Sequence, residues 1–362
     1  MKRIAWSCLL IVITLSYRIP ADARVSGICS NCHTMHNSQD NSAIVSGMPN
    51  STMLVTDCVG CHSATDSTTI HEIGGHPVPI VFNATEPTYP PDGSTSSALA
   101  GGNFFWVQDG AHGDAYGHNV FGISAADTTL SNAPGASTSC SACHNTLASA
   151  ASGCKGCHVA RHHADDSTEV VGEEGGYYRF LGSVMHADYD WLPGEGVKGI
   201  ESDDWEQNPS STNHNGYMGT ADAYAKKGTG PYIDRYTIAQ KCNGCHGIFH
   251  HMMNSDQTNM DLVGDYYGAW LRHPSDVVLP NSGEYANYTV YDPMVPVAKP
   301  DLTGKKNDGS VVPGTDIVTC ISCHRAHGSP FKDMLRWDYS SMLAGSGSNE
   351  NGCFKCHSTK DD

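Results

Sequence analysis

Long stretches of this chain show no clean hydrophobic period. Neither a helical spacing of apolar residues nor a strict alternation of apolar and polar residues is sustained over most of its length. Segments 86–102 (EPTYPPDGSTSSALAGG) and 299–315 (KPDLTGKKNDGSVVPGT) are typical of coil and turns, because Gly, Pro, Asp and Ser interrupt them. The pattern predicts mostly irregular coil with short helices and few short strands.

One apolar run lies at the N-terminus, from Ile4 to Leu15. A basic start precedes it, and the small residues Ala21-Asp22-Ala23 follow it, so residues 1–23 are predicted to be a secretory signal peptide. The run is too short to span a bilayer, which takes about 20 apolar residues. Since no later stretch is apolar enough to cross a membrane, we expect residues 24–362 to be exported without a membrane span.

The net charge is acidic, −17 for the whole chain and about −19 without residues 1–23. No basic patch is available to hold phosphates, which excludes nucleic acid and anionic membrane surfaces as expected partners. The charge suits a cationic or mineral partner, or a solvated acidic surface.

Cysteine spacing determines the class of protein. The chain has 15 cysteines, and all except Cys8 lie in C-x-x-C pairs. A histidine directly follows every pair. The motifs are Cys29/Cys32/His33, Cys58/Cys61/His62, Cys140/Cys143/His144, Cys154/Cys157/His158, Cys242/Cys245/His246, Cys320/Cys323/His324 and Cys353/Cys356/His357.

C-x-x-C-H is the attachment motif of c-type haem. Two thiols three positions apart can form thioethers with the two vinyl groups of a porphyrin, and the adjacent histidine binds the iron as proximal ligand. A zinc ribbon shares one metal between two C-x-x-C pairs and requires no following histidine. A redox or structural disulfide requires none either. The sequence therefore predicts seven covalently attached haem c groups.

Seven haems amount to one for about every 48 residues, which leaves little room for an ordinary apolar core. We expect an elongated multihaem cytochrome c fold in which the haem faces form the core and a Gly- and Pro-rich chain wraps over them. Residues 24–362 are predicted to be one heptahaem unit, divided for convenience into blocks 24–100, 101–235 and 236–362.

Thirteen histidines remain beyond the seven proximal ones, enough to give each iron a second imidazole. Methionine is the alternative sixth ligand, but the excess of histidine favours bis-histidine ligation. An iron with two axial imidazoles has no open position for a substrate, so the pattern predicts electron transfer and no enzymatic activity. A reductase would need one iron without its distal ligand.

Some spare histidines lie directly beside a motif. His36 in CHTMH and His327 in CHRAH follow a proximal histidine by three residues, and His250 in CHGIFHH follows one by four. Such a residue cannot reach the opposite face of its own porphyrin, but it can reach a different haem. We expect these histidines to bind the irons of neighbouring haems.

The sequence resembles the family of extracellular multihaem c-type cytochrome filaments, the cytochrome nanowires of metal-reducing bacteria, and most closely its hexahaem, OmcS-like members. The resemblance runs almost end to end and in the same order. The matching stretches are CSNCHTMHNS, GHNVFGISAADTTLSNAPG, LRHP, YTVYDPMVPVAKPDL, CISCHRAHGS, FKDMLRWDY and CFKCH.

The resemblance implies that His36 binds the iron held by Cys320 and Cys323 of the next subunit. It also implies His71, His118, His250, His273 and His327 as distal ligands. The Cys154/Cys157 motif is extra relative to the hexahaem pattern, and His163 or His162 is expected to serve it or its neighbour. His186 and His214 are in reserve for this middle part, and His76 is in reserve for His71.

We therefore expect an exported heptahaem cytochrome that carries out long-range extracellular electron transfer and polymerises into a conductive filament at or outside the cell surface. Its expected partners are copies of itself, redox partner cytochromes, and extracellular acceptors such as metal oxides. The first alternative is a monomeric periplasmic electron carrier. A multihaem reductase is the less favoured one.

Overall fold

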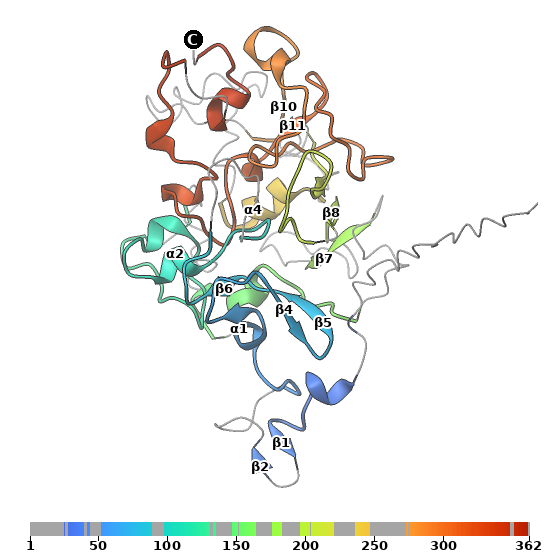
Figure 1. Ribbon diagram of the computed structural model, residues 1–362, viewed down its shortest axis with the longest axis vertical. Helices are drawn as coiled ribbons and strands as arrows, with labels where there is room; N and C mark the ends of the chain where they lie inside the picture. The colour runs from blue at the N-terminus through green and yellow to red at the C-terminus, as the bar shows by residue number, and fades with distance from the viewer. Residues whose placement is uncertain are drawn as a thin grey trace, which may run out of the picture.

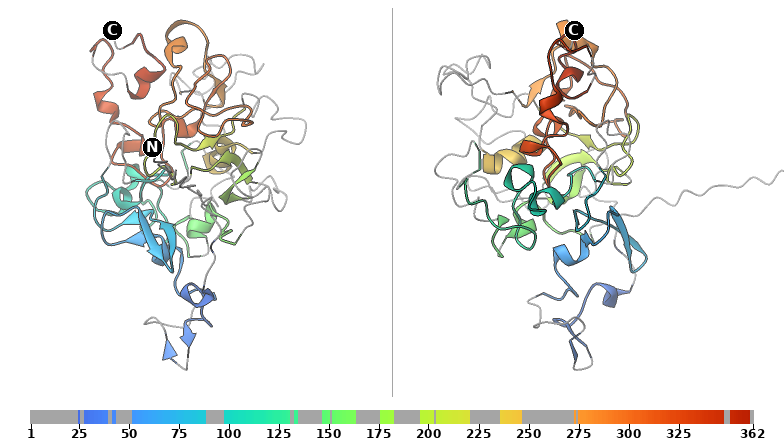
Figure 2. Two further views of the ribbon diagram at one scale, coloured as in Figure 1. Left: turned by 45° about the vertical axis from the view of Figure 1, so that its right-hand side comes forward. Right: turned by 60° about the vertical axis from the view of Figure 1, so that its left-hand side comes forward.

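The computed structural model describes residues 25, 28–39, 42–43, 52–88, 98–130, 133–134, 147–150, 152–163, 176–182, 196–202, 204–220, 236–246, 273, 275–347 and 351–360. Their arrangement is elongated: an N-terminal arm protrudes at one end, and the C-terminal segment lies at the other (Figure 1). The arm, residues 28–55 where described, protrudes in both views of Figure 2 as well.

Short helices form at the haem motifs. Each of the six motifs that the structure describes lies on a helical turn, because one turn carries two cysteines three positions apart on the same side. These helices are η1 (Cys29–Asn31), α1 (Cys58–Cys61), η4 (Gly153–Gly156), α4 (Ile238–His246), η7 (Cys320–Ser322) and η10 (Gly352–Lys355). The prediction of short helices in a mostly irregular chain is confirmed.

Between the motifs lie further short helices and strands. The other helices are α2 (Phe105–Gln108), η2 (Asp114–Tyr116), η6 (Gly283–Asn287), η8 (Lys332–Met334) and η9 (Tyr339–Ser341). The antiparallel pairs are β1 (Ser38–Gln39) with β2 (Ser42–Ala43), β4 (Ile70–Ile73) with β5 (His76–Pro79), and β10 (Val277–Val278) with β11 (Ile317–Val318). Strands β3 (Ser63–Ala64) and β6 (Phe82–Asn83) are parallel, and β7 (Tyr177–Gly182), β8 (Gly196–Ile200) and β9 (Gly216–Tyr217) form an antiparallel sheet.

The β4–β5 hairpin illustrates how local sequence determines an element. Gly74 and Gly75 connect the strands, and both have positive φ, 62° and 84°. A two-residue type I′ turn requires this conformation at both central positions, and glycine adopts it without steric cost.

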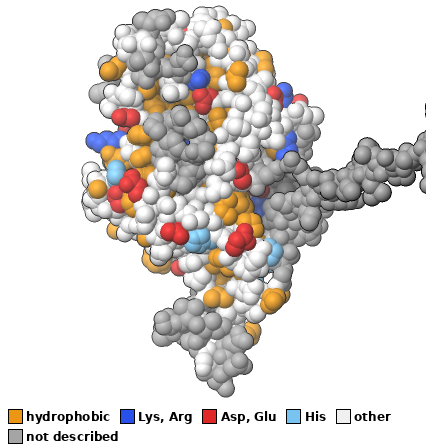
Figure 3. Space-filling view, viewed as in Figure 1, with side chains coloured by type: hydrophobic (Ala, Val, Ile, Leu, Met, Phe, Trp, Pro, Cys, Tyr) orange, Lys and Arg blue, Asp and Glu red, His pale blue; other side chains and the backbone are white. Residues whose placement is uncertain are grey.

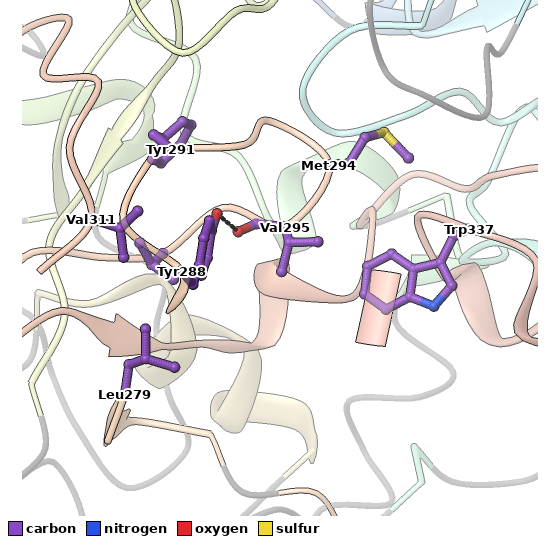
Figure 4. Close-up of a cluster of buried hydrophobic side chains, with 8 residues drawn as sticks. Leu279, Tyr288, Tyr291, Met294, Val295, Val311 and Trp337 are labelled. Carbon is purple, nitrogen blue, oxygen red and sulfur yellow. Dashed lines mark hydrogen bonds between the residues drawn. The ribbon is translucent and has the colours of Figure 1, made fainter. Parts of the chain in front are cut away.

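Hydrophobic side chains of the described residues gather in small clusters that border the motifs. Figure 4 shows the C-terminal one, where Tyr288 and Trp337 are buried and the Tyr288 hydroxyl donates to the carbonyl of Val295 at 2.6 Å. The partly buried side chains of Cys323, Cys353 and Cys356 pack against this cluster. A second cluster surrounds Tyr178, Val197 and Ile317, and a third surrounds Phe104, Val107 and Val120.

A buried charged network ties together the loops beside the C-terminal cluster. The Lys299 ammonium donates to the Asp316 carboxylate and to the carbonyl of Ser310. The Asp308 carboxylate accepts from Lys305 at 2.8 Å and lies 3.9 Å from Lys299. Since each buried charge faces an opposite one, the network avoids the cost of an uncompensated buried ion.

No helix among the described residues is long and apolar enough to cross a membrane.

Candidate haem sites

A backbone hydrogen bond closes most of the described haem motifs. In five of the six described motifs, the N–H of the histidine donates to the carbonyl of the first cysteine at 2.8–3.1 Å. In the sixth, Cys242, Cys245 and His246 all lie within helix α4, and both thiols are partly buried. The structure forms no disulfide among the twelve cysteines that it describes. Both thiols and the imidazole of each motif therefore project from one compact turn, as haem attachment requires.

The Nδ1 atom of every described proximal histidine faces a hydrogen-bond acceptor. Five acceptors are backbone carbonyls, and the sixth is a carboxylate. The pairs are His33 with Met53 O (3.2 Å), His62 with Pro79 O (2.8 Å), His158 with Phe180 O (3.1 Å), His246 with Pro134 O (3.1 Å), His324 with Asp333 O (2.7 Å) and His357 with Glu284 Oε1 (3.2 Å). Because an acceptor holds the proton on Nδ1, Nε2 is left to bind a metal.

Five of these proximal rings face a second histidine ring. The ring centres of the five pairs lie 5.9–6.2 Å apart. They are His33 with His163, His62 with His162, His246 with His118, His158 with His327, and His357 with His273. A metal–imidazole bond of about 2 Å, plus about 1 Å from nitrogen to ring centre, separates two axial rings on one metal by about 6 Å. The residues therefore fit bis-histidine haem iron.

Two of the facing histidines are oriented in the same way as the proximal ones. His118 Nδ1 donates to the carbonyl of Ala326 at 2.6 Å, and His163 Nδ1 donates to that of Val25 at 3.1 Å. The ring of His327 stacks on Phe104 with centres 4.7 Å apart. A Cβ on Gly101 would lie 3.0 Å from the same ring, so glycine leaves the space that His327 occupies.

Burial keeps the facing imidazoles of His158 and His327 neutral. Burial, assisted by the charge of Lys241, lowers the pKa of His158 to about 4. Burial, followed by the proximity of His158, lowers the pKa of His327 to about 3. Only a neutral imidazole has a lone pair for a metal, so both side chains are in the binding form at neutral pH.

Two pairs of motifs lie close together at their cysteines. The neighbouring thiol of Cys154 lowers the pKa of Cys58 to about 6, and Cys58 in turn raises the pKa of Cys154. Cys320 likewise raises the pKa of Cys242, and Cys242 lowers the pKa of Cys320. Each pair belongs to motifs far apart in the sequence.

A buried lysine lies among the thiols of two motifs. Burial lowers the pKa of Lys241 to about 8, and the nearby thiols of Cys157, Cys242 and Cys245 act in the opposite direction. Both attachment cysteines of helix α4 therefore lie close to the Cys154/Cys157 motif.

Further electrostatic contacts link these motifs into one series. After burial, the nearby Cys32 thiol helps to raise the pKa of Cys61. Cys157 acts on Cys242 in the same way, behind the larger effects of Cys320 and burial. Burial and the thiols of Cys353 and Cys356 raise the pKa of Cys323 to about 12. The six described motifs thus adjoin one another in chain order, beginning with Cys29/Cys32 and ending with Cys353/Cys356.

The structure does not bring every candidate histidine to a described proximal ring. His71 Nε2 lies 3.5 Å from Asp66 Oδ1, and His76 lies in the paired strand β5. His214 stacks on Tyr291 with ring centres 3.6 Å apart, and its two nitrogens contact the carbonyls of Asn215 and Asp308. His36 lies exposed on the N-terminal arm with φ 58°.

Several predictions lie outside the described residues. They are the signal peptide (1–23), the third motif (Cys140, Cys143 and His144) and the candidate ligands His186 and His250.

Two features were not anticipated from spacing. The first is that His162 and His163 face two different proximal rings, those of His62 and His33. Their direct adjacency was a usable signal, because neighbouring residues in an irregular chain can point to different sides. The second is the carboxylate of Glu284 at His357, which no local motif marks.

Comparison with known proteins gives consistent results. Residues 313–362 match the family described as the doubled CXXCH motif. The C-type cytochrome OmcS of Geobacter sulfurreducens is 24% identical over 380 aligned residues, covering 86% of this chain and 78% of the relative.

Solved filament structures share the fold. The outer membrane cytochrome S filament of Geobacter sulfurreducens matches with a TM-score of 0.50 and 20% identity, covering 88% of this chain and 85% of that one. The OmcS nanowires of the same organism, from cryo-EM, match with a TM-score of 0.51 and 19% identity, covering 94% and 91%. In its sequence motifs and in its fold, the chain is similar to the multihaem c-type cytochrome OmcS.

Proposed function

We propose that the chain binds seven haem c groups through its seven C-x-x-C-H motifs and transfers electrons along them. The observation that carries the proposal is the set of five facing imidazole pairs, each beside an attachment motif and each at the spacing of two axial ligands. Bound haem iron supplies reversible one-electron oxidation and reduction. Imidazoles on both faces leave no position for a substrate, which favours electron transfer over catalysis.

The distal ligands follow from the same pairs. Each facing histidine is assigned as the distal ligand of its partner's iron: His163 at His33, His162 at His62, His327 at His158, His118 at His246 and His273 at His357. The candidates for the distal ligand of the iron at His144 are His71, His76, His186 and His250. The electrostatic influence of cysteines in neighbouring motifs on one another supports a continuous path through the six described haem sites.

We further propose that the chain polymerises, with His36 as the distal ligand of the iron at His324 in a neighbouring copy. His36 lies on the protruding arm, which also carries Ile28 and Met35, and these two residues are 71% and 66% exposed. Near the other end of the sequence, Tyr339 and Leu343 are 68% and 61% exposed. Figure 3 shows hydrophobic side chains on the described part of the arm and near the opposite end.

Two different exposed surfaces at opposite ends suit a head-to-tail interface, which builds open filaments when its rotation does not close a ring. The relative with a known structure is a filament, which agrees with this assembly. Export through residues 1–23 would place the filament outside the cell, where redox cytochromes or metal oxides are the expected electron acceptors.

Electron microscopy of the haem-loaded protein tests the assembly. The native chain should form ordered fibres, whereas His36→Ala should remain monomeric with all its haems attached. Ser38→Ala is the matched control, because Ser38 is exposed on the same arm and carries no imidazole. Fibres from His36→Ala would refute the ligand-sharing joint, and monomers from the native chain would favour a monomeric carrier.

Haem content tests the underlying function separately. Pyridine haemochrome analysis should return seven equivalents of haem per chain, with a fully low-spin ferric spectrum. A far lower count would overturn the proposal, and turnover of a small oxidant at a high-spin haem would favour a reductase.

A further inference from the structure

We propose that Glu284 is a positioning residue that holds the reduction potential of the haem at Cys353 and Cys356 below the value that a neutral acceptor would give. The inference rests on the proposed haem attachment, and it adds a determinant that the attachment motif does not contain.

Glu284 differs in charge from the other acceptors of proximal histidines. Its Oε1 lies 3.2 Å from Nδ1 of His357. The other five described proximal histidines donate to neutral backbone carbonyls. A carboxylate with an ordinary pKa of about 4.3 is ionised at neutral pH, so His357 donates to a full negative charge.

The carboxylate is held in place from several sides. Its Oε2 accepts from the Thr359 hydroxyl at 3.2 Å, and its main-chain carbonyl accepts from Ser358 Oγ at 2.7 Å. The Asn287 amide also donates to Ser358 Oγ at 2.8 Å. These bonds clamp helix η6 to the segment after helix η10, so the carboxylate keeps its position at the imidazole.

The charge of Glu284 is only partly screened at the ring, which is itself 30% exposed. The Glu284 side chain is 12% exposed, and the Tyr285 ring lies against His357 with centres 5.2 Å apart. Lys360 lies 3.9 Å from Oε2 but is 61% exposed, so water screens its charge strongly. Lys355, on the neighbouring turn, forms its ion pair with Asp292 at 3.0 Å.

The effect on the iron has a definite sign. A charged acceptor attracts the Nδ1 proton more strongly than a carbonyl does, which makes Nε2 a stronger electron donor. Stronger donation and a nearby negative charge both stabilise ferric over ferrous iron, so the potential falls. An electron on this haem is therefore higher in energy. The haem belongs to the C-terminal motif, which lies next to Cys323 at the end of the described series of motifs.

Glu284→Gln in the haem-loaded full-length chain tests the proposal. Glutamine keeps the size and the acceptor but removes the charge. Spectroelectrochemical titration should show one component shifted to higher potential with the others unchanged, and one low-spin ferric EPR signal should change. Asp333→Asn is the matched control, because it also removes a carboxylate near a motif, but His324 donates to the main chain of Asp333.

A second variant predicts the opposite shift. Thr359→Val removes a donor from Glu284 but keeps the carboxylate, so the charge acts more strongly on His357 and the same component should move to lower potential. Full haem content with unchanged potentials in both variants would overturn this inference alone. Missing haem in the native chain would overturn the proposed function instead.

Discussion

An imidazole binds a metal through one nitrogen, so the partner of its other nitrogen determines how the ring is aimed. In this chain the partners are mostly backbone carbonyls supplied by residues outside the motif, such as Pro134 for His246 and Phe180 of strand β7 for His158. The residues between motifs therefore orient the iron ligands, although they carry no motif of their own.

His327 provides a direct test of bis-histidine ligation. We expect His327→Phe to keep an aromatic ring against Phe104 but to leave the iron at His158 without its distal ligand. The spectrum should gain a high-spin component of about one haem in seven, and this haem should bind added carbon monoxide when reduced. His112→Phe is the control, because His112 contacts Asp109 and Tyr116. A fully low-spin spectrum for His327→Phe would contradict the pairing.

The attachment residues could be predicted from sequence, and the ligand pairing could not. A C-x-x-C-H motif is local, so Cys154, Cys157 and His158 are recognisable without a fold. Whether His162 or His163 faces His62 depends on which loops meet, and that is determined by packing over the whole chain. For the same reason, the carboxylate of Glu284 at His357 was not foreseeable.

At the scale of elements, each haem turn depends on local hydrogen bonds that anchor its ends. Helix η7 is anchored at its N-terminus: the N–H of Thr319 donates to Ser322 Oγ at 3.0 Å, and the N–H of Ser322 donates to the carbonyl of Thr319 at 2.9 Å. Ser322 Oγ also donates to the carbonyl of Pro296. The buried Ser322 thereby joins the Cys320/Cys323 motif to a separate loop.

Ser322→Ala should destabilise this turn, because it leaves a buried N–H and a buried carbonyl without their partner. We expect a loss of about 1–3 kcal/mol, the cost of unsatisfied buried groups. A lower thermal midpoint of the haem-loaded protein would show the loss. Ser340→Ala, in the exposed helix η9, should change the midpoint far less. Equal midpoints for native protein and Ser322→Ala would contradict the assigned anchoring role.

Elements differ in how far sequence predicts them. The Gly74-Gly75 turn is a local signal, and the helical turns follow from the motifs. The two-residue strands β3 and β6 pair in parallel across intervening loops, and Gly102 bridges to Gly328. Such pairings depend on contacts distant in sequence, so no local period of hydrophobic residues reveals them.

At the scale of the whole molecule, acid should weaken the fold through Asp308. Burial acts to raise the pKa of this carboxyl, but hydrogen bonds from Lys305 and Ser310 and the charge of Lys299 outweigh it, so the pKa lies well below its usual value. A depressed carboxyl pKa contributes stability above the unfolded value of about 4, and this contribution is lost as the pH falls toward the folded pKa.

Asp308→Asn should therefore lower the thermal midpoint at pH 7, with a loss of about 1–2 kcal/mol. The difference from the native protein should begin to shrink as the pH falls below about 4, where Asp308 of the unfolded native chain takes up its proton, and it should continue to shrink toward the lower pKa of the folded state. Glu72→Gln, on the exposed face of strand β4, is the control. A difference that stays constant down to acidic pH would contradict the role of the ionised carboxylate.

The facing imidazole pairs join positions on the order of a hundred residues or more apart, such as His33 with His163 and His158 with His327. With iron between them, each pair becomes a cross-link that closes a long loop. A protease that nicks the backbone inside such a loop would leave both fragments fastened to the same porphyrin. Cleavage would then appear on a denaturing gel without loss of the assembled particle.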